Sequence, residues 1–128
     1  MREDEEIEII YKSKEELEKI ISKIKNLKFD ELKKKRYYEI SVLEKNTDEI
    51  ELKEYFTKFD KIKLIFWRKR ASGYNNYDFH YEKEDGTYFI YAINIEMNPP
   101  ELINAFHAKK SFKNFVKIIS RRYWNKIV

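Results

Sequence analysis

Apolar residues recur along the chain with two periods, and each period predicts one kind of element. Helical spacing runs from Leu17 to Leu27, directly after a capping box formed by Ser13 and Glu16, so we expect a helix there. Elsewhere apolar and polar side chains alternate, which is typical of strands with one buried face. Strands are expected at 7–12, 37–45, 62–69, 77–83 and 87–96.

Residues 46–58 fit two different elements. Ile50 and Leu52 alternate with polar residues as they would in the return strand of a hairpin. Residues 46–48 can instead cap a helix whose apolar positions would be Leu52, Tyr55, Phe56 and Phe59. The helical match is the longer of the two, so we favour a helix.

The loop at 84–86 allows two registers for the hairpin between the last two strands. A two-residue turn would pair Tyr81 with Ile90, whereas a three-residue loop with Gly86 in the left-handed conformation would pair Lys83 with Thr87. The second register gathers the large apolar side chains on one face: Tyr77, Phe79, Tyr81, Phe89, Tyr91, Ile93 and Ile95. A slip of one residue would scramble this set, so we expect the second register.

Two helices are predicted after the hairpin. Asn98 and Glu101 resemble a second capping box around Pro99-Pro100, which predicts a short helix over 102–106. Ser111 is expected to cap a terminal helix whose apolar face comprises Phe112, Phe115, Val116, Ile119 and Tyr123.

These elements predict an α+β fold in a single domain over residues 1–128. The expected order is β-α-β-(α)-β-β-β-α-α, with the second helix being the one at 46–58. We expect a mostly antiparallel sheet of about five strands with the helices packed on one face. The acidic residues 1–6 are expected to form a loose tail.

Positive charge is concentrated in the second half of the chain. Residues 61–128 hold 13 Lys or Arg against 6 Asp or Glu, whereas residues 1–60 hold 14 against 17. From Leu102 onward there are seven Lys or Arg and no acidic residue, and the row of Lys110, Lys113, Lys117 and Arg121 lies opposite the apolar face of the terminal helix. This pattern predicts a nucleic-acid-binding surface comprising Arg68, Lys69, Arg70, Lys109, Lys110, Lys113, Lys117, Arg121 and Trp124.

The basic row also has a plainer explanation as a solvated helix surface. Burying four large apolar side chains contributes roughly 1.5–3 kcal/mol each, whereas like charges at helical spacing cost a few tenths of a kcal/mol per pair. The helix therefore tolerates the row without any partner.

Composition excludes several classes of protein. The chain is 42% hydrophobic and 39% charged, which indicates a globular domain. It has no cysteine, and therefore no disulfide and no thiolate metal site. No apolar run approaches the ~20 residues of a membrane span, and no signal peptide is recognisable, so we expect a cytoplasmic protein. The abundance of Lys, Glu, Ile and Tyr is typical of a thermophilic or an AT-rich source.

Candidate chemical groups lie on the hairpin and near the terminal helix. Asp78, His80 and Glu82 share one strand face, which is compatible with a general base or a divalent metal, and equally with an ordinary solvent-facing strand. His107 beside Lys109 and Lys110 is a second candidate base, to be paired with Tyr123 or Arg121, while Arg121 or Arg122 would stabilise phosphorane charge. No cofactor is expected, because the chain has no Gly-rich phosphate loop and no zinc-ligand spacing.

The order of a strand, helices, a strand cluster and a basic terminal segment resembles the small RNA-cleaving toxins of the RelE type. Lys61-Ile62-Lys63-Leu64 followed by Ser72-Gly73-Tyr74 adds to this likeness, which covers about half of the chain. The resemblance implies a metal-independent ribonuclease. The charge pattern itself favours a non-catalytic nucleic-acid-binding protein. A third hypothesis is an assembly protein, which would associate with itself or with an acidic protein partner.

Overall fold

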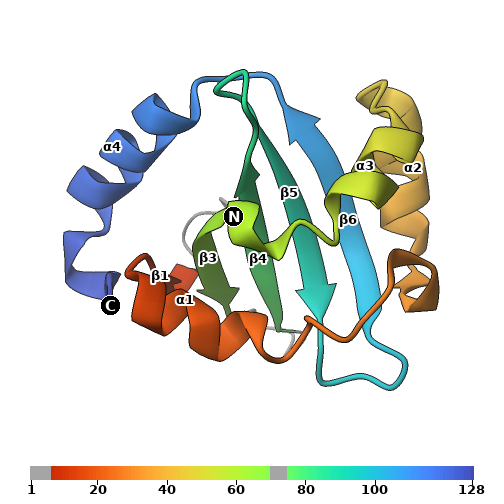
Figure 1. The fold of residues 1–128 in the computed structure, drawn as a ribbon, viewed down its shortest axis with the longest axis horizontal. Coiled ribbons are helices and arrows are strands. Elements are labelled where there is room, and N and C mark those ends of the chain that lie inside the picture. The colour runs from red at the N-terminus through yellow and green to blue at the C-terminus, as the bar shows by residue number, and fades with distance from the viewer. Residues whose placement is uncertain (1–6, 70–74) are drawn as a thin grey trace.

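The computed structural model describes residues 7–69 and 75–128, and these residues form one six-stranded sheet with four α-helices (Figure 1). The strands are β1 (Ile7–Tyr11), β2 (Lys33–Lys34), β3 (Ile62–Arg68), β4 (Asn76–Glu82), β5 (Tyr88–Asn94) and β6 (Glu101–Ala108). The helices are α1 (Lys14–Ile21), α2 (Arg36–Glu44), α3 (Glu49–Tyr55) and α4 (Phe112–Arg122), with 3-10 turns η2 (Phe29–Glu31), η3 (Phe59–Lys61) and η4 (Trp124–Lys126). The predicted α+β class is confirmed.

The strand order is β1-β3-β4-β5-β6-β2, and neighbours are antiparallel except for the two-residue pairing of β2 with β6. In the part of the chain that the structure describes, no helix has both the length and the apolar character needed to cross a bilayer.

The register of the β4–β5 hairpin is the one predicted from the apolar pattern. The Lys83 amide donates to the Thr87 carbonyl over 2.8 Å, and Gly86 adopts a φ of +88°. Tyr81 therefore pairs with Phe89. Only glycine adopts this left-handed conformation without steric cost, which explains its position in the loop.

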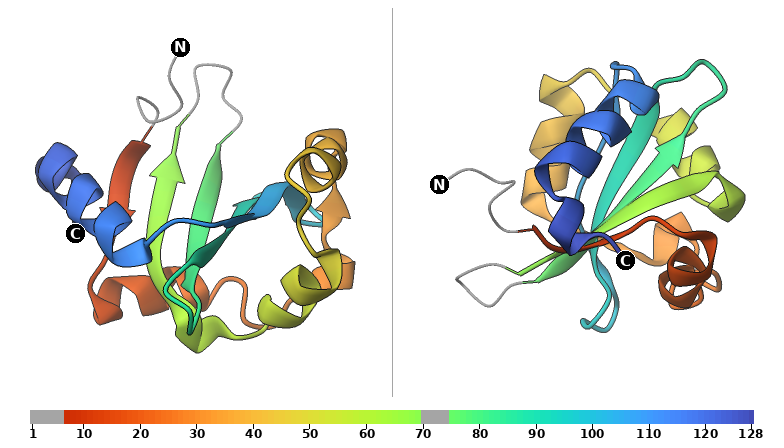
Figure 2. Two further views of the ribbon diagram at one scale, coloured as in Figure 1. Left: turned by 90° about the horizontal axis from the view of Figure 1, so that it is seen from above. Right: turned by 90° about the vertical axis from the view of Figure 1, so that its left-hand side faces the viewer.

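The sheet separates two hydrophobic cores, one on each face. The first core contains the predicted aromatic set of the hairpin together with Leu17, Leu52 and Phe56 from the helical region of the chain. The second core lies on the opposite face and contains Phe112 and Ile119 of α4. Figure 2 shows α4 across the sheet from α1 and α3. The expectation that all helices pack on one face is therefore corrected.

The prediction of a strand at 37–45 is wrong, because most of this segment belongs to helix α2. Tyr38, Ile40 and Val42 alternate in sequence, but Ile40 is exposed while Tyr38 and Ser41 are buried. The helix is apolar on its outer side as well as its inner side, so its periodicity is weak. An exposed isoleucine at one position was sufficient to imitate the alternation of a strand.

The short helix predicted at 102–106 is also wrong, because Glu101–Ala108 is strand β6 and Asn98 lies in the turn before it. Ala92 pairs with Asn104 while Ile93 pairs with Leu102, so Ile103 is an extra residue in a β-bulge. The bulge places Leu102 and Ala105 in the same core although they are three residues apart. This three-residue spacing of apolar side chains led to the prediction of a helix.

The helix caps are confirmed where polar side chains reach backbone amides. The amides of Glu16 and Asn114 donate to the hydroxyls of Ser13 and Ser111, each over 3.3 Å. Asp48 accepts from the Ile50 amide at 3.0 Å and begins α3, so the helical alternative for 46–58 is correct.

Buried tyrosine hydroxyls connect α3 to the sheet. Tyr81 donates to the Phe56 carbonyl over 2.7 Å, and Tyr91 donates to the Leu52 carbonyl over 2.5 Å. Both tyrosines have no exposed surface, and burial raises the pKa of each well above its ordinary value. They act as neutral donors that satisfy carbonyls at the end of α3.

We predict that Tyr81→Phe lowers the free energy of unfolding by about 1–3 kcal/mol, because the buried Phe56 carbonyl loses its donor. Urea unfolding followed by circular dichroism measures the change. Tyr37→Phe is the matched control, since Tyr37 is 57% exposed, and it should leave stability within about 0.5 kcal/mol of the parent. Equal effects of the two substitutions would contradict the role of the Tyr81 hydroxyl.

Candidate functional site

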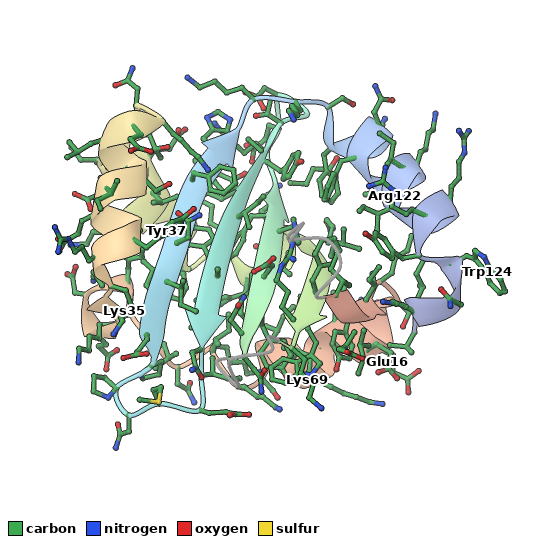
Figure 3. All side chains as sticks on the ribbon, turned by 180° about the vertical axis from the view of Figure 1, so that it is seen from behind. Glu16, Lys35, Tyr37, Lys69, Arg122 and Trp124 are labelled. Carbon is green, nitrogen blue, oxygen red and sulfur yellow. The ribbon has the colours of Figure 1, made fainter. Side chains whose placement is uncertain are left out.

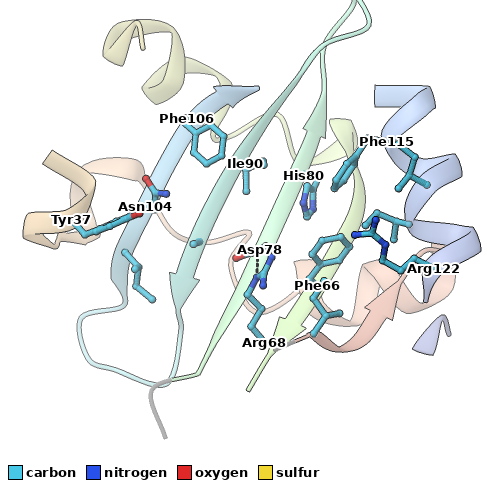
Figure 4. Close-up of a pocket in the computed structure, with 15 residues that line it drawn as sticks. Tyr37, Phe66, Arg68, Asp78, His80, Ile90, Asn104, Phe106, Phe115 and Arg122 are labelled. Carbon is cyan, nitrogen blue, oxygen red and sulfur yellow. Dashed lines mark hydrogen bonds and ion pairs between the residues drawn. The ribbon is translucent and has the colours of Figure 1, made fainter. Parts of the chain in front are cut away.

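A groove runs over the second face of the sheet, between α2 and α4, and encloses about 460 Å³ (Figure 4). Its floor comes from strands β3 to β6, and its walls come from the two helices. The apolar and aromatic residues that line it are Ile7, Tyr37, Phe66, Ile90, Ala92, Ile103, Phe106, Phe115, Ile118 and Ile119. The polar residues of the described chain that line it are Arg68, Asp78, His80, Asn104 and Arg122.

The carboxylate of Asp78 is buried on the floor and is held by two donors. Arg68 donates from Nε to Oδ2, and the side-chain amide of Asn76 donates to Oδ1 over 2.7 Å. Asp78 is 6% exposed and Asn76 is fully buried. A buried charge is costly unless it is paired and hydrogen-bonded, and here both carboxylate oxygens are satisfied.

His80 lies beside this pair and is enclosed by aromatic rings. Its ring centroid is 4.5 Å from that of Phe66 and 5.5 Å from that of Phe115. The Leu64 carbonyl lies 3.0 Å from Nδ1, and because a carbonyl only accepts, the proton is assigned to Nδ1. Burial lowers the pKa of His80 to about 4, against a smaller opposing effect of Asp78. The imidazole is therefore neutral at pH 7.

The structure does not bring Asp78, His80 and Glu82 together as a metal site. Within residues 7–69 and 75–128, no three His, Cys, Asp or Glu side chains are placed to hold a metal ion. Asp78 is already engaged by Arg68, and Nδ1 of His80 is engaged by a carbonyl. The three residues share a strand face as predicted, but that face lies beneath the groove, so the interpretation of it as solvent-facing is wrong for Asp78 and His80.

His107 lies on the other face of the sheet. Its ring centroid is 5.0 Å from that of Phe89 in the first core, and its Nε2 is 2.7 Å from the hydroxyl of Thr87. Burial, followed by the charge of Lys83, lowers the pKa of His107. Tyr123 packs against the second core, so the predicted pairing of His107 with Tyr123 is not formed. Of the candidate catalytic groups, His80 and Arg122 are the two that line the groove.

The outer face of α4 carries the basic row. Lys110, Lys113, Lys117 and Arg121 are all exposed, and among the described residues none of them forms an ion pair with a carboxylate. Lys109 is exposed at the start of the same segment. Trp124 follows the helix in η4 and is 74% exposed (Figure 3). The four cations of the row and Trp124 therefore all reach solvent, as the sequence predicted.

The loop after β3 contributes less to this surface than expected. Arg68 is directed into the groove and pairs with Asp78, so its charge is used inside the molecule. Lys69 is exposed at the end of the strand, and Arg70 lies outside the described residues, as do Ser72, Gly73 and Tyr74.

The groove was not predicted from the sequence, because the residues that line it belong to separate predicted strands and helices whose arrangement in space was unknown. The one available signal was the second apolar face of the hairpin region. Ile90 and Ala92 interrupt the polar alternation that a solvated face would show.

We predict that His80 makes unfolding depend on pH. The unfolded chain takes up a proton near pH 6.5, whereas the folded protein resists protonation until about pH 4, so the stability present above pH 6.5 is lost as pH falls. Between pH 7 and pH 5 the free energy of unfolding should fall by on the order of 2 kcal/mol from this group. Urea unfolding at the two pH values measures the loss, and His80→Gln should reduce it.

The matched control is His107→Gln, which removes the other of the two histidines and leaves the contribution of His80 in place. NMR titration of both imidazoles gives their pKa values directly. A His80 pKa close to 6.5 would contradict the assignment of a buried neutral ring.

Comparison of the chain with protein-family models, curated proteins and solved structures found no match. The likeness to RelE-type toxins therefore stays a prediction. The argument for function rests on two surfaces that share one helix: the outer face of α4, with its basic row, and the inner face, which forms a wall of the groove.

Proposed function

We propose that this protein binds nucleic acid through the outer face of α4 and does not act on it chemically. The observation that carries the proposal is the row of Lys110, Lys113, Lys117 and Arg121, exposed and without an ion-paired carboxylate among the described residues. Phosphate groups spaced along a strand are the natural complement of such a row. By contrast, the exposed Lys53 is paired with Asp30, and the largely buried Lys83 is paired with Glu51.

The helix is held at both ends, which supports its use as a rigid binding surface. At its start the Phe112 amide donates to the Gly86 carbonyl over 2.8 Å. Beyond its end the Val128 amide donates to Ile10 over 2.8 Å, and Lys126 reaches the Ile7 carbonyl at 2.6 Å. A preorganised row loses little conformational entropy on binding.

Trp124 favours single-stranded over double-stranded nucleic acid as the partner. Its indole is largely exposed next to the row, and exposed aromatic rings stack on bases that are not paired. The ribonuclease alternative is less well supported. Its two candidate bases are the enclosed His80 and His107 on the opposite face of the sheet from Arg122.

We predict that labelled single-stranded RNA or DNA binds with a log–log salt slope of about −3, the value for four phosphate contacts on a single strand. Replacing Lys113, Lys117 and Arg121 with Glu should weaken binding by at least about tenfold at low salt and make the slope shallower. Fluorescence anisotropy across a salt series measures both quantities.

The matched control replaces Lys25, Lys28 and Lys33 with Glu, which gives the same change in net charge at exposed positions away from α4. This variant should bind with an affinity within about threefold of the parent, because long-range charge effects are screened by salt. Equal losses in the two variants would show that net charge, and not the helix face, governs binding.

A second candidate function is self-assembly, favoured by apolar side chains exposed on α2 and α3. Leu43 is 82% exposed and Ile50 is 73% exposed, and Ile40 lies on the same side of α2 as Leu43. Exposed large apolar side chains that lie together are typical of protein interfaces.

We predict that, if α2 is an interface, the parent forms a concentration-dependent dimer that Leu43→Lys abolishes. A lysine introduced at the centre of an interface would be desolvated without a partner, whereas at a solvated position it costs little. Sedimentation velocity at several concentrations distinguishes the two. A parent that stays monomeric at high concentration would exclude this self-assembly.

A further inference from the structure

We infer that the groove between α2 and α4 binds a small uncharged aromatic molecule with an N–H or O–H donor, and that the side-chain amide of Asn104 accepts from this donor. The inference is independent of nucleic-acid binding, because it concerns the inner side of α4 and not the basic row on its outer side. The groove encloses about 460 Å³, which lies within the range of small-molecule sites.

The carbonyl oxygen of the Asn104 side chain is an acceptor without a donor. Its Oδ1 atom is buried and has no hydrogen-bond partner among the described residues. Figure 4 shows Asn104 at the α2 side of the groove, with Tyr37 extending toward it. Leaving a buried polar atom unpaired costs stability, and native structures contain few such atoms. A donor on a ligand in the groove would satisfy it.

Two hydroxyl oxygens are also buried without a partner, but neither residue lines the groove. They are Oγ of Ser41 and Oγ1 of Thr47. Ser41 lies in α2, where a hydroxyl can turn toward the carbonyl four residues earlier in its own helix. An amide oxygen has no proton to donate, so Asn104 needs a donor from another group. Of these three described atoms, Oδ1 of Asn104 is therefore the one placed for a ligand.

The β-bulge in β6 puts Asn104 on the groove face of the sheet. Successive side chains of a regular strand point to opposite faces. Ile103 and Asn104 are adjacent in sequence and both line the groove, whereas Leu102 and Ala105 on either side belong to the first core. Without the extra residue, Asn104 would share the face of Leu102 and point into that core. Bulges that redirect a side chain in this way are common beside active sites.

The ionisable residues of the groove leave no charge for a ligand. Asp78 is the only carboxylate among the described lining residues, and Arg68 and Asn76 already hold it. Arg122 also has an interaction partner. His80 is buried and neutral at pH 7. A charged ligand would lose its hydration without gaining an opposite charge, so the lining selects an uncharged molecule.

Aromatic and branched apolar side chains define the rest of the ligand. Tyr37 and Ile118 form opposing walls and are both exposed, so they retain surface that a ligand would remove from water. Ile90 and Phe106 lie on the floor. Aromatic rings pack on one another in offset or edge-to-face arrangements, which makes a flat aromatic ligand the natural complement of Tyr37 and Phe106.

The test compares indole with 1-methylindole by isothermal titration calorimetry on the folded full-length protein. The two molecules share an aromatic frame, but only indole has an N–H donor. We expect saturable binding of indole at about one molecule per chain, about fivefold tighter than binding of 1-methylindole. The added methyl group enlarges the apolar surface, so 1-methylindole would bind at least as tightly if no acceptor were waiting. Failure of indole to saturate, or equal binding of the two, would overturn the inference.

Charged relatives of indole test the second part of the assignment. Indole-3-acetate is an anion at pH 7 and tryptamine is a cation, and both keep the N–H donor. Each should bind several-fold more weakly than indole, because the described lining has no unmatched charge to offer. Tighter binding of either ion would overturn the assignment of an uncharged ligand.

Asn104→Leu removes the acceptor, and Asn114→Leu makes the same change at an exposed position outside the groove. Asn104→Leu should abolish the preference for indole over 1-methylindole, whereas Asn114→Leu should keep it. Thermal melting should show Asn104→Leu at least as stable as the parent, because a buried unpaired acceptor is lost. A retained preference in Asn104→Leu would overturn the role of the amide. If this variant does not fold, the comparison of the two ligands on the parent still decides.

Two further measurements separate the groove from the basic row. The variant with Glu at Lys113, Lys117 and Arg121 should lose nucleic-acid binding and keep indole binding, so each proposal can fail without the other. Nucleobases are themselves aromatic donors, and saturating indole is therefore added to the complex of the parent with a labelled oligonucleotide. The anisotropy should not change. Displacement of the strand would overturn the assignment of the groove to a free small molecule.

Discussion

The register of the β4–β5 hairpin decides which side chains each face of the sheet presents. Gly86 closes a three-residue loop, and the pairing that follows puts Phe79, Tyr81 and Tyr91 into the first core. The same register puts Asp78, His80 and Tyr88 on the opposite face. A slip of one residue would turn two ionisable side chains toward the apolar first core, where burial of a charge is costly.

The second face is stable because its polar residues have partners. Asp78 is neutralised by Arg68, and His80 remains uncharged while its Nδ1 proton is donated to Leu64. Aromatic rings of Phe66, Tyr88 and Phe115 then enclose this polar cluster near α4. Farther toward α2 the floor is mostly apolar, and the side chains that the structure describes leave the space above it open, which produces the groove.

Much of the fold could be predicted from the sequence because local signals agreed with the tertiary structure. Ser13, Asp48 and Ser111 mark helix starts through side-chain hydrogen bonds that involve only nearby residues. The hairpin register followed from a large set of aromatic residues that had to share one face. In both cases the information lies within about twenty residues of sequence, so long-range packing did not alter it.

The failures arise where long-range context overrides the local pattern. The bulge at Ile103 is visible only in the pairing with β5, and it gave β6 the spacing of a helix. Ile40 and Leu43 hid the helical period of α2, because apolar side chains on an exposed face carry no information about the core. The basic row could be predicted since it depends on one helix, whereas the groove combines residues from seven elements spread over the whole described chain.

Helix α4 presents the basic row and a wall of the groove on different sides of its axis. At about 100° per residue, Lys113 and Lys117 lie roughly 140° and 100° around the helix axis from Ile118. Arg122 lies about 40° from Ile118 on its other side, and it lines the groove as Ile118 does. A phosphate strand on the outer face therefore does not have to contact the side chains that line the groove. The basic row and the groove wall share the helix backbone, which is attached at its two ends and packs on the sheet through Phe112, Phe115 and Ile119. Because these attachments hold the helix on the sheet, the fold itself sets the position of the basic row before any partner binds.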